Sequence, residues 1–212
     1  KYTSVNDGGG SIFFKGETLA AYLSSICRTM GVRLENVSAV RNFKKMKNYS
    51  VITILPNVIE AYKEFGVFRA AQTNNAATIN TINLRDYSLD KHGTVDSPPY
   101  GGGDGMVLRP EPLASAVRGV AGKPIVICPS PGGEVWTQDH AKKYALEERP
   151  LVFVCGRFGG MDQRFIDSFV EHEYSMGNFV VSGGELPALM MMDSILRFVP
   201  DVLGHNESAA ND

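Results

Sequence analysis

Short β-branched runs alternate with longer amphipathic runs from Tyr49 onward, and this alternation limits the possible folds more than any other feature of the chain. Apolar runs of four to eight residues suit buried strands, whereas apolar residues that recur every three or four positions suit helices. Strands are predicted at 51–55, 77–84, 124–128, 151–155 and 179–182. Helices are predicted at 57–65, 111–120, 138–147, 162–170 and 185–198. Such alternation predicts an α/β fold, a parallel sheet flanked by helices.

The last predicted helix follows directly on the last predicted strand. Glu185 stands where a helix N-terminus favours negative charge, and Pro187 suits a first helical turn. Apolar residues recur through this helix at helical spacing and are expected to face the core. They are Leu186, Leu189, Met190 and Val199.

Glycine-rich bends follow or frame three of the predicted strands, at 130–133, 156–160 and 175–184. Ligands of parallel α/β sheets bind beyond the carboxyl ends of the strands, so these bends are expected to converge on one small molecule. The sequence contains neither the G-x-G-x-x-G pattern of dinucleotide sites nor the G-x-x-x-x-G-K-[ST] pattern of triphosphate sites. The bends instead favour a ligand whose amide, amine and ring edges are recognised by backbone groups.

Residues 1–48 differ in character from the rest and are treated as an N-terminal extension of unassigned role, with a helix predicted at 18–30. They hold eight Lys or Arg against three acidic residues, although the whole chain has a net charge of −2. No apolar run approaches the roughly 18–20 residues of a membrane span, so no membrane contact and a cytoplasmic location are expected. Cys27, Cys128 and Cys155 lack metal-binding spacing and are expected to be reduced.

Five motifs, together with two short continuations near the C-terminus, carry a resemblance to a known family. They are Asp90 to Asp96, Pro99 to Gly103, Ser130-Pro131, Cys155-Gly156-Arg157 and Ser182 to Pro187, continued by Arg197 to Pro200 and Val202 to Gly204. In these motifs the chain resembles the TrmD family, the bacterial tRNA (guanine-N1)-methyltransferases of the knotted SPOUT class. The resemblance covers about 49–212 and leaves 1–48 outside.

The resemblance implies a SPOUT methyltransferase domain at 49–204 with a C-terminal deep trefoil knot. It also implies a homodimer with the active site at the subunit interface, and methylation of N1 of the guanosine 3′ of the anticodon, position 37 of tRNA, by S-adenosylmethionine. Magnesium is allowed as a second cofactor, although no metal ligands are assigned. Residues 205–212 are expected to begin a linker to a C-terminal tRNA-binding domain that lies outside this chain.

The same resemblance assigns site residues by position. The cofactor would be bound by Cys128, Pro129, Ser130, Pro131, Gly133, Gly156, Phe158, Gly160, Met161, Met176, Gly177, Asn178, Phe179, Val180, Val181, Gly183, Gly184 and Pro187. The tRNA would be faced by His92, Asp96, Tyr100, Gly101, Gly102, Gly103 and Gly105.

The chemistry of the reaction defines two catalytic roles. Guanine N1 carries a proton that must leave before N1 can attack, so a carboxylate is needed as general base. Negative charge then spreads to O6, where a cation stabilises the transition state. The resemblance assigns the base to Asp212 and the cation to Arg197.

Two residues depart from the family pattern: Gly159 stands where glutamate is usual, and Asn178 where aspartate is usual. These differences keep open an alternative, a non-catalytic protein of the same fold that binds S-adenosylmethionine or RNA without turnover. A further alternative is a nucleotide-binding regulator on a plain parallel α/β sheet, for which the motifs would be accidental.

Overall fold

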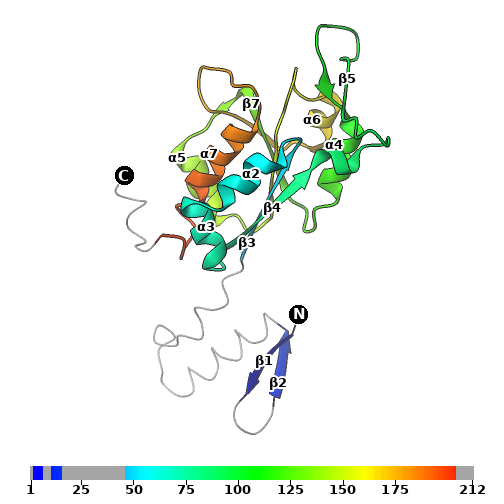
Figure 1. The fold of residues 1–212 in the computed structure, drawn as a ribbon. Coiled ribbons are helices and arrows are strands. Elements are labelled where there is room, and N and C mark those ends of the chain that lie inside the picture. The colour runs from blue at the N-terminus through cyan, green and yellow to red at the C-terminus, as the bar shows by residue number, and fades with distance from the viewer. Residues whose placement is uncertain (1, 7–10, 16–45, 204–212) are drawn as a thin grey trace. The chain divides into compact units, whose positions relative to one another are not determined.

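The computed structural model describes residues 2–6, 11–15 and 46–203 (Figure 1). The chain divides into two compact units, Lys1–Lys45 and Met46–Asp212, which are described separately. In the first unit, strands β1 (Tyr2–Asn6) and β2 (Ser11–Lys15) pair antiparallel. The helix predicted at 18–30 and the thiol of Cys27 lie outside the described residues.

A five-stranded parallel sheet forms the centre of the second unit. Its strands are β3 (Lys47–Thr53), β4 (Ala77–Asn83), β7 (Ile125–Val135), β8 (Leu151–Val154) and β9 (His172–Ser175). They lie in the order β4-β3-β8-β7-β9, and every neighbouring pair runs parallel. The predicted parallel α/β fold is therefore confirmed.

Helices cover both faces of this sheet (Figure 1). One face carries α2 (Pro56–Lys63), α3 (Gly66–Thr73), α5 (Gln138–Leu146) and α7 (Glu185–Leu196). The other face carries α4 (Pro110–Arg118), α6 (Gln163–Phe169) and the 3-10 turn η3 (Leu84–Tyr87). Two further short strands, β5 (Asp96–Ser97) and β6 (Val107–Leu108), pair antiparallel as a hairpin. None of the helices described in this structure is long and apolar enough to cross a membrane.

Alternate residues of the central strands belong to two hydrophobic cores. In β8, Leu151 and Phe153 pack with α2, α3, α5 and α7, whereas Val152 and Val154 pack with α4 and α6. The split follows from the period of two in a strand, which points successive side chains to opposite faces. Because both faces are covered, the strand reads in the sequence as a continuous apolar run.

The structure corrects the predicted strand at 179–182. No strand forms there: Phe179 and Val180 are 57% and 77% exposed, and β9 is the fifth strand instead. β9 ends at Ser175, and Gly177 just beyond it has a φ of +131°, which is not a strand conformation, so the strand does not continue to Phe179. Helix α3 was not predicted either, and it follows α2 with only Glu64 and Phe65 between them.

Helix α7 begins at Glu185 as predicted, but not all of its expected core residues are buried. Leu189 lies on the buried side and Val199 is buried just beyond the helix, whereas Leu186 and Met190 are 58% and 53% exposed. Residues four positions apart share one helix face, so Leu186 and Met190 form an apolar stripe on the outer face of α7. The prediction that these two residues face the core is wrong.

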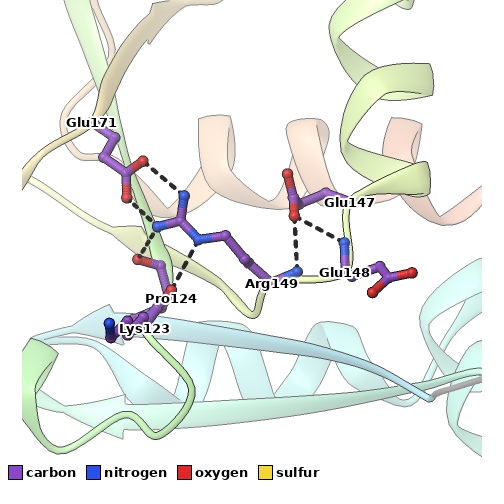
Figure 2. A network of polar contacts seen from close by, with 6 residues as sticks. All are labelled: Lys123, Pro124, Glu147, Glu148, Arg149 and Glu171. Carbon is purple, nitrogen blue, oxygen red and sulfur yellow. Dashed lines mark hydrogen bonds and ion pairs between the residues drawn. The ribbon is translucent and has the colours of Figure 1, made fainter. Parts of the chain in front are cut away.

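A polar network ties together the amino ends of β7, β8 and β9 (Figure 2). Arg149 Nη2 donates to Glu171 Oε1 at 2.6 Å, and Arg149 also donates to the backbone carbonyls of Lys123 and Pro124 at 3.0 and 3.2 Å. Glu147 Oε1 accepts the N–H groups of the two residues that follow it, both at 2.9 Å. These contacts lie at the opposite end of the strands from their carboxyl ends.

Candidate functional site

A cavity of about 520 Å³ opens at the carboxyl ends of β7, β8 and β9. Its lining includes Cys128 and Pro129 of β7, Gly156 just after β8 and Met176 just after β9. The volume falls within the roughly 300–1,000 Å³ of small-molecule sites. The three glycine-rich bends thus converge on one cavity, at the edge of the sheet where α/β proteins bind their ligands.

The first wall of the cavity is an excursion within strand β7. Pro129 and Glu134 both lie opposite Tyr174 of β9, so residues 130–133 leave the ladder and return to it. Gly133 permits the return, because a Cβ at this position would lie 2.5 Å from the backbone carbonyl carbon of Glu173. Ser130, inside the excursion, faces the cavity.

The second wall is the loop that follows β8. Gly159 donates its N–H to the carbonyl of Met106 at 2.7 Å, and Leu108 donates to the carbonyl of Gly160 at 3.0 Å. A Cβ at Gly159 would lie 3.0 Å from the same Met106 oxygen, so the glycine that departs from the family pattern packs closely against backbone here. Through Leu108, which pairs with Asp96, this loop is attached to the β5–β6 hairpin.

The third wall leads from Phe179 to the start of α7. Gly184 donates its N–H to the Gly156 carbonyl at 2.9 Å, and a Cβ at Gly184 would lie 2.8 Å from the Cα of Cys155. Only glycine allows the second and third walls to approach this closely. Behind them, Glu185 accepts a hydrogen bond from Thr53 Oγ1 at 2.7 Å.

Both cysteines described near the cavity are buried free thiols, as expected for reduced core residues. Burial raises the pKa of the Cys128 thiol and raises that of Cys155 well above its ordinary value. A thiol that stays protonated is a poor nucleophile, so neither cysteine suits a covalent role.

Most of the residues predicted to bind a cofactor line this cavity. They are Cys128, Pro129, Ser130, Pro131, Gly156, Phe158, Gly160, Met161, Met176, Phe179, Val180, Val181, Gly183, Gly184 and Pro187. Gly133, Gly177 and Asn178 are not among the lining residues, and the two glycines shape the backbone instead.

The cavity has eight further lining residues that were not assigned individually. Four lie within the glycine-rich bends 156–160 and 175–184, which are expected to meet at the ligand: Arg157, Gly159, Ser175 and Ser182. The other four were missed: Gln163, Ile166, Glu173 and Tyr174. Glu173 and Tyr174 belong to β9, which was not predicted, and nothing in the sequence marked them.

The sequence pattern of the family described as tRNA (Guanine-1)-methyltransferase TrmD matches residues 46–212, most of the chain. The chain belongs to the TrmD family. It is 43% identical over 169 residues to a tRNA (guanine-N(1)-)-methyltransferase of Desulforamulus reducens, covering 76% of this chain and 65% of the relative. A protein of the same name from a Sulfurihydrogenibium species is 43% identical over 170 residues, with 79% and 66% covered. The chain thus spans about two thirds of the length of these relatives.

A solved structure of the TrmD family has the same fold. The crystal structure of tRNA (m1G37) methyltransferase from Aquifex aeolicus superposes with a TM-score of 0.70 at 36% sequence identity. The superposition covers 76% of this chain and 73% of that one. The sequence-based assignment to the TrmD family is therefore confirmed.

The residues that the TrmD resemblance assigns to the tRNA side lie outside the cavity lining. They are His92, Asp96, Tyr100, Gly101, Gly102, Gly103 and Gly105. Tyr100 is 91% exposed, and the Arg164 guanidinium carbon lies 5.5 Å from its ring centroid. Arg164 also donates to Asp162 Oδ2 at 2.7 Å and lowers the pKa of that carboxyl. An exposed ring and a fixed cation therefore stand beside the loop that carries the cavity's second wall.

Of the two residues assigned to catalysis, only Arg197 belongs to the described residues, and it does not line the cavity of this chain. Arg197 is the residue that follows α7, away from the cavity lining, and Asp212 lies outside the described residues. Asp193, one turn before Arg197, has a pKa raised by burial. Within 2–6, 11–15 and 46–203, no group of three or more His, Cys, Asp or Glu side chains is arranged to hold a metal ion.

Proposed function

We propose that this chain is the catalytic part of a methyltransferase that transfers the methyl group of S-adenosylmethionine to N1 of guanosine 37 in tRNA. The observation that carries the proposal is the cavity between three backbone loops at the carboxyl ends of β7, β8 and β9, in a chain of the TrmD family. The names of its relatives, tRNA (guanine-N(1)-)-methyltransferase, support the same reaction. A tRNA substrate also favours action in the cytoplasm.

The residues around the cavity fit S-adenosylmethionine. Gly183 and Gly184 line the cavity without side chains, so an adenine ring can approach the backbone closely there. Glu173 and Arg157 also line it and offer a carboxylate and a guanidinium to the oppositely charged groups of an amino acid. When bound, this cofactor supplies a methyl group on a sulfonium, which needs no further activation.

The chain's own residues then have to remove a proton and stabilise a charge. We assign the general base for guanine N1–H to Asp212, because a carboxylate within hydrogen-bond reach can accept that proton. Arg197 is assigned to the developing charge on O6, which a fixed cation stabilises most effectively where water is excluded.

The position of Arg197 argues for an active site shared between two copies of the chain. The stretch of α7 from Pro187, which lines the cavity, to Arg197 spans about 15 Å at roughly 1.5 Å per residue. An Arg197 that acts at the cavity is therefore expected to come from a second subunit. The exposed stripe of Leu186 and Met190 on α7 offers an apolar surface for that subunit. A trefoil knot remains part of this proposal.

Calorimetric titration of the chain with S-adenosylmethionine and with ATP tests the binding step. We expect the former to bind and the latter to give no heat; absence of binding by S-adenosylmethionine refutes the proposal. Transfer of labelled methyl to a transcript with guanosine 37, with and without magnesium, tests turnover and metal dependence. Binding without transfer, in a chain extended to the full length of its relatives, would favour the non-catalytic alternative.

Mixed subunits test the shared site and the catalytic assignments together. Arg197→Ala and Gly184→Val chains are each expected to be inactive, and a mixture of the two is expected to regain part of the activity. Asp212→Asn should bind S-adenosylmethionine normally and transfer the methyl group at least about a hundredfold more slowly. An unchanged rate in Asp212→Asn would remove the general-base assignment.

A further inference from the structure

Glu185 is a buried carboxylate that joins three separate segments of the chain. Its side chain is 3% exposed. Thr53 Oγ1, at the end of β3, donates to Oε1 at 2.7 Å, and Arg157 Nε, in the loop after β8, donates to Oε2 at 3.2 Å. Glu185 itself begins α7. The contacts therefore connect the central sheet, the second cavity wall and the helix that follows the third wall.

Stability alone does not explain this arrangement. Desolvating a carboxylate costs several kcal/mol, and a buried ion pair recovers that cost only with good geometry and further hydrogen bonds. The helix N-terminus supplies some compensation, because it favours negative charge. A charge kept at such cost suggests that it fixes a particular arrangement of its partners.

The partner that matters for the cavity is Arg157. Its side chain lines the cavity, and its Nη1 donates to the backbone carbonyl of Ser182 at 3.2 Å. Ser182 is the last residue of the exposed segment 179–182, and this segment does not pair with any strand of the described residues. Arg157 therefore contacts both Glu185 and the last residue of this segment.

We propose that Glu185 is a positioning residue for the cavity: through Arg157 it fixes the segment 179–182 in the arrangement that binds the ligand. Its role in affinity rests on the proposed function, since the ligand is S-adenosylmethionine. The hold on the segment does not depend on the ligand and can be measured without it.

Glu185→Gln is the sharpest probe, because glutamine keeps the shape and an acceptor but loses the charge. Charged hydrogen bonds are about twice as strong as neutral ones, so we expect affinity for S-adenosylmethionine to fall about tenfold, which corresponds to 1.4 kcal/mol. Hydrogen exchange in the ligand-free protein should rise at the Gly184 amide, which is bonded to Gly156. The exchange of β8 amides should not change.

Glu171→Gln is the matched control, because Glu171 also pairs with an arginine between strand ends, but at the opposite end of the sheet (Figure 2). It should leave both affinity and Gly184 exchange within about twofold of the unchanged chain. Arg157→Lys keeps a cation beside Glu185 but loses the Ser182 bond, and it should raise Gly184 exchange even if Glu185→Gln fails to fold.

Two results would overturn the proposal. The first is that both variants, Glu185→Gln and Arg157→Lys, fold and exchange the Gly184 amide at the same rate as the unchanged chain. The other is an equal loss of affinity in Glu171→Gln, which would make the effect one of general stability. Failure of the unchanged chain to bind S-adenosylmethionine would instead refute the proposed function, and the exchange experiment would still decide the role of Glu185.

Discussion

Replacing Gly133 by alanine should damage the β7 excursion far more than the same change one residue earlier. A Cβ at Gly133 would lie 2.5 Å from the carbonyl carbon of Glu173 and 2.6 Å from the nitrogen of Tyr174. A Cβ at Gly132 would have nothing within 4 Å. The two variants add the same methyl group to the same loop, so they differ only in the space that receives it.

The magnitude follows from these distances. Nonbonded carbon atoms are most favourable about 3.5–4.0 Å apart, so the excursion and β9 would have to separate by about 1 Å. Overpacking costs about 1–3 kcal/mol, and the upper end applies here because both neighbours are backbone atoms of the sheet. For a domain of roughly 150–250 residues, each kcal/mol lowers Tm by about 2–4 °C, so Gly133→Ala should lower it by about 6–12 °C.

Thermal unfolding followed by circular dichroism measures this difference directly. Gly132→Ala should melt within about 2 °C of the unchanged chain, as expected for a surface substitution. Gly133→Ala should also weaken binding of S-adenosylmethionine, because Ser130 and Pro131 of the excursion line the cavity. Equal melting temperatures for the two variants would refute the claim that the close approach to β9 requires glycine.

Three further predictions concern other parts of the fold. Burial lowers the pKa of His172, so the unfolded chain takes up a proton more readily as pH falls through about 6.5. The contribution of neutral His172 to the free energy of unfolding should be fully present above that pH and should fall below it. In urea unfolding, His172→Asn should therefore lose less stability between pH 7 and pH 5 than the unchanged chain does. In a Cys27→Ser chain, the buried Cys128 and Cys155 should react with a thiol reagent only after denaturation; rapid reaction at pH 8 would contradict their raised pKa values. Arg149→Ala should cost about 1 kcal/mol, because its ion pair is exposed, and calorimetry should find ligand affinity unchanged.

The central strands were predictable because their burial is recorded in the residues themselves. Val152, Phe153 and Val154 are apolar on both faces of the sheet, so a local run of sequence reports the strand. β9 was not predictable, because His172 and Glu173 have little strand preference and are ordered by pairing with β7. The apolar segment 179–182 was misread because apolar residues at a cavity mouth look like a strand in the sequence.

The part of the candidate site that is formed by backbone was predictable from the sequence. Gly183 and Gly184 allow the second and third walls to approach closely, and both glycines line the cavity. The contact of Arg157 with Glu185 was not predictable, because it joins residues 28 positions apart. Glu185 was explained as a helix-terminus charge, which is consistent with its position but describes none of its side-chain contacts.

The return of β7 to its place beside β9 also makes the number of residues in the excursion matter. After the excursion, Val135 lies opposite Ser175, and Trp136 then packs against Tyr174 with ring centroids 5.0 Å apart. Removing one residue from 130–133 would either strain the loop or slip the register by one, and a slip reverses the faces of the side chains that follow. Trp136 would then leave its aromatic neighbours. Evolution can therefore exchange side chains in this wall more freely than it can shorten the wall.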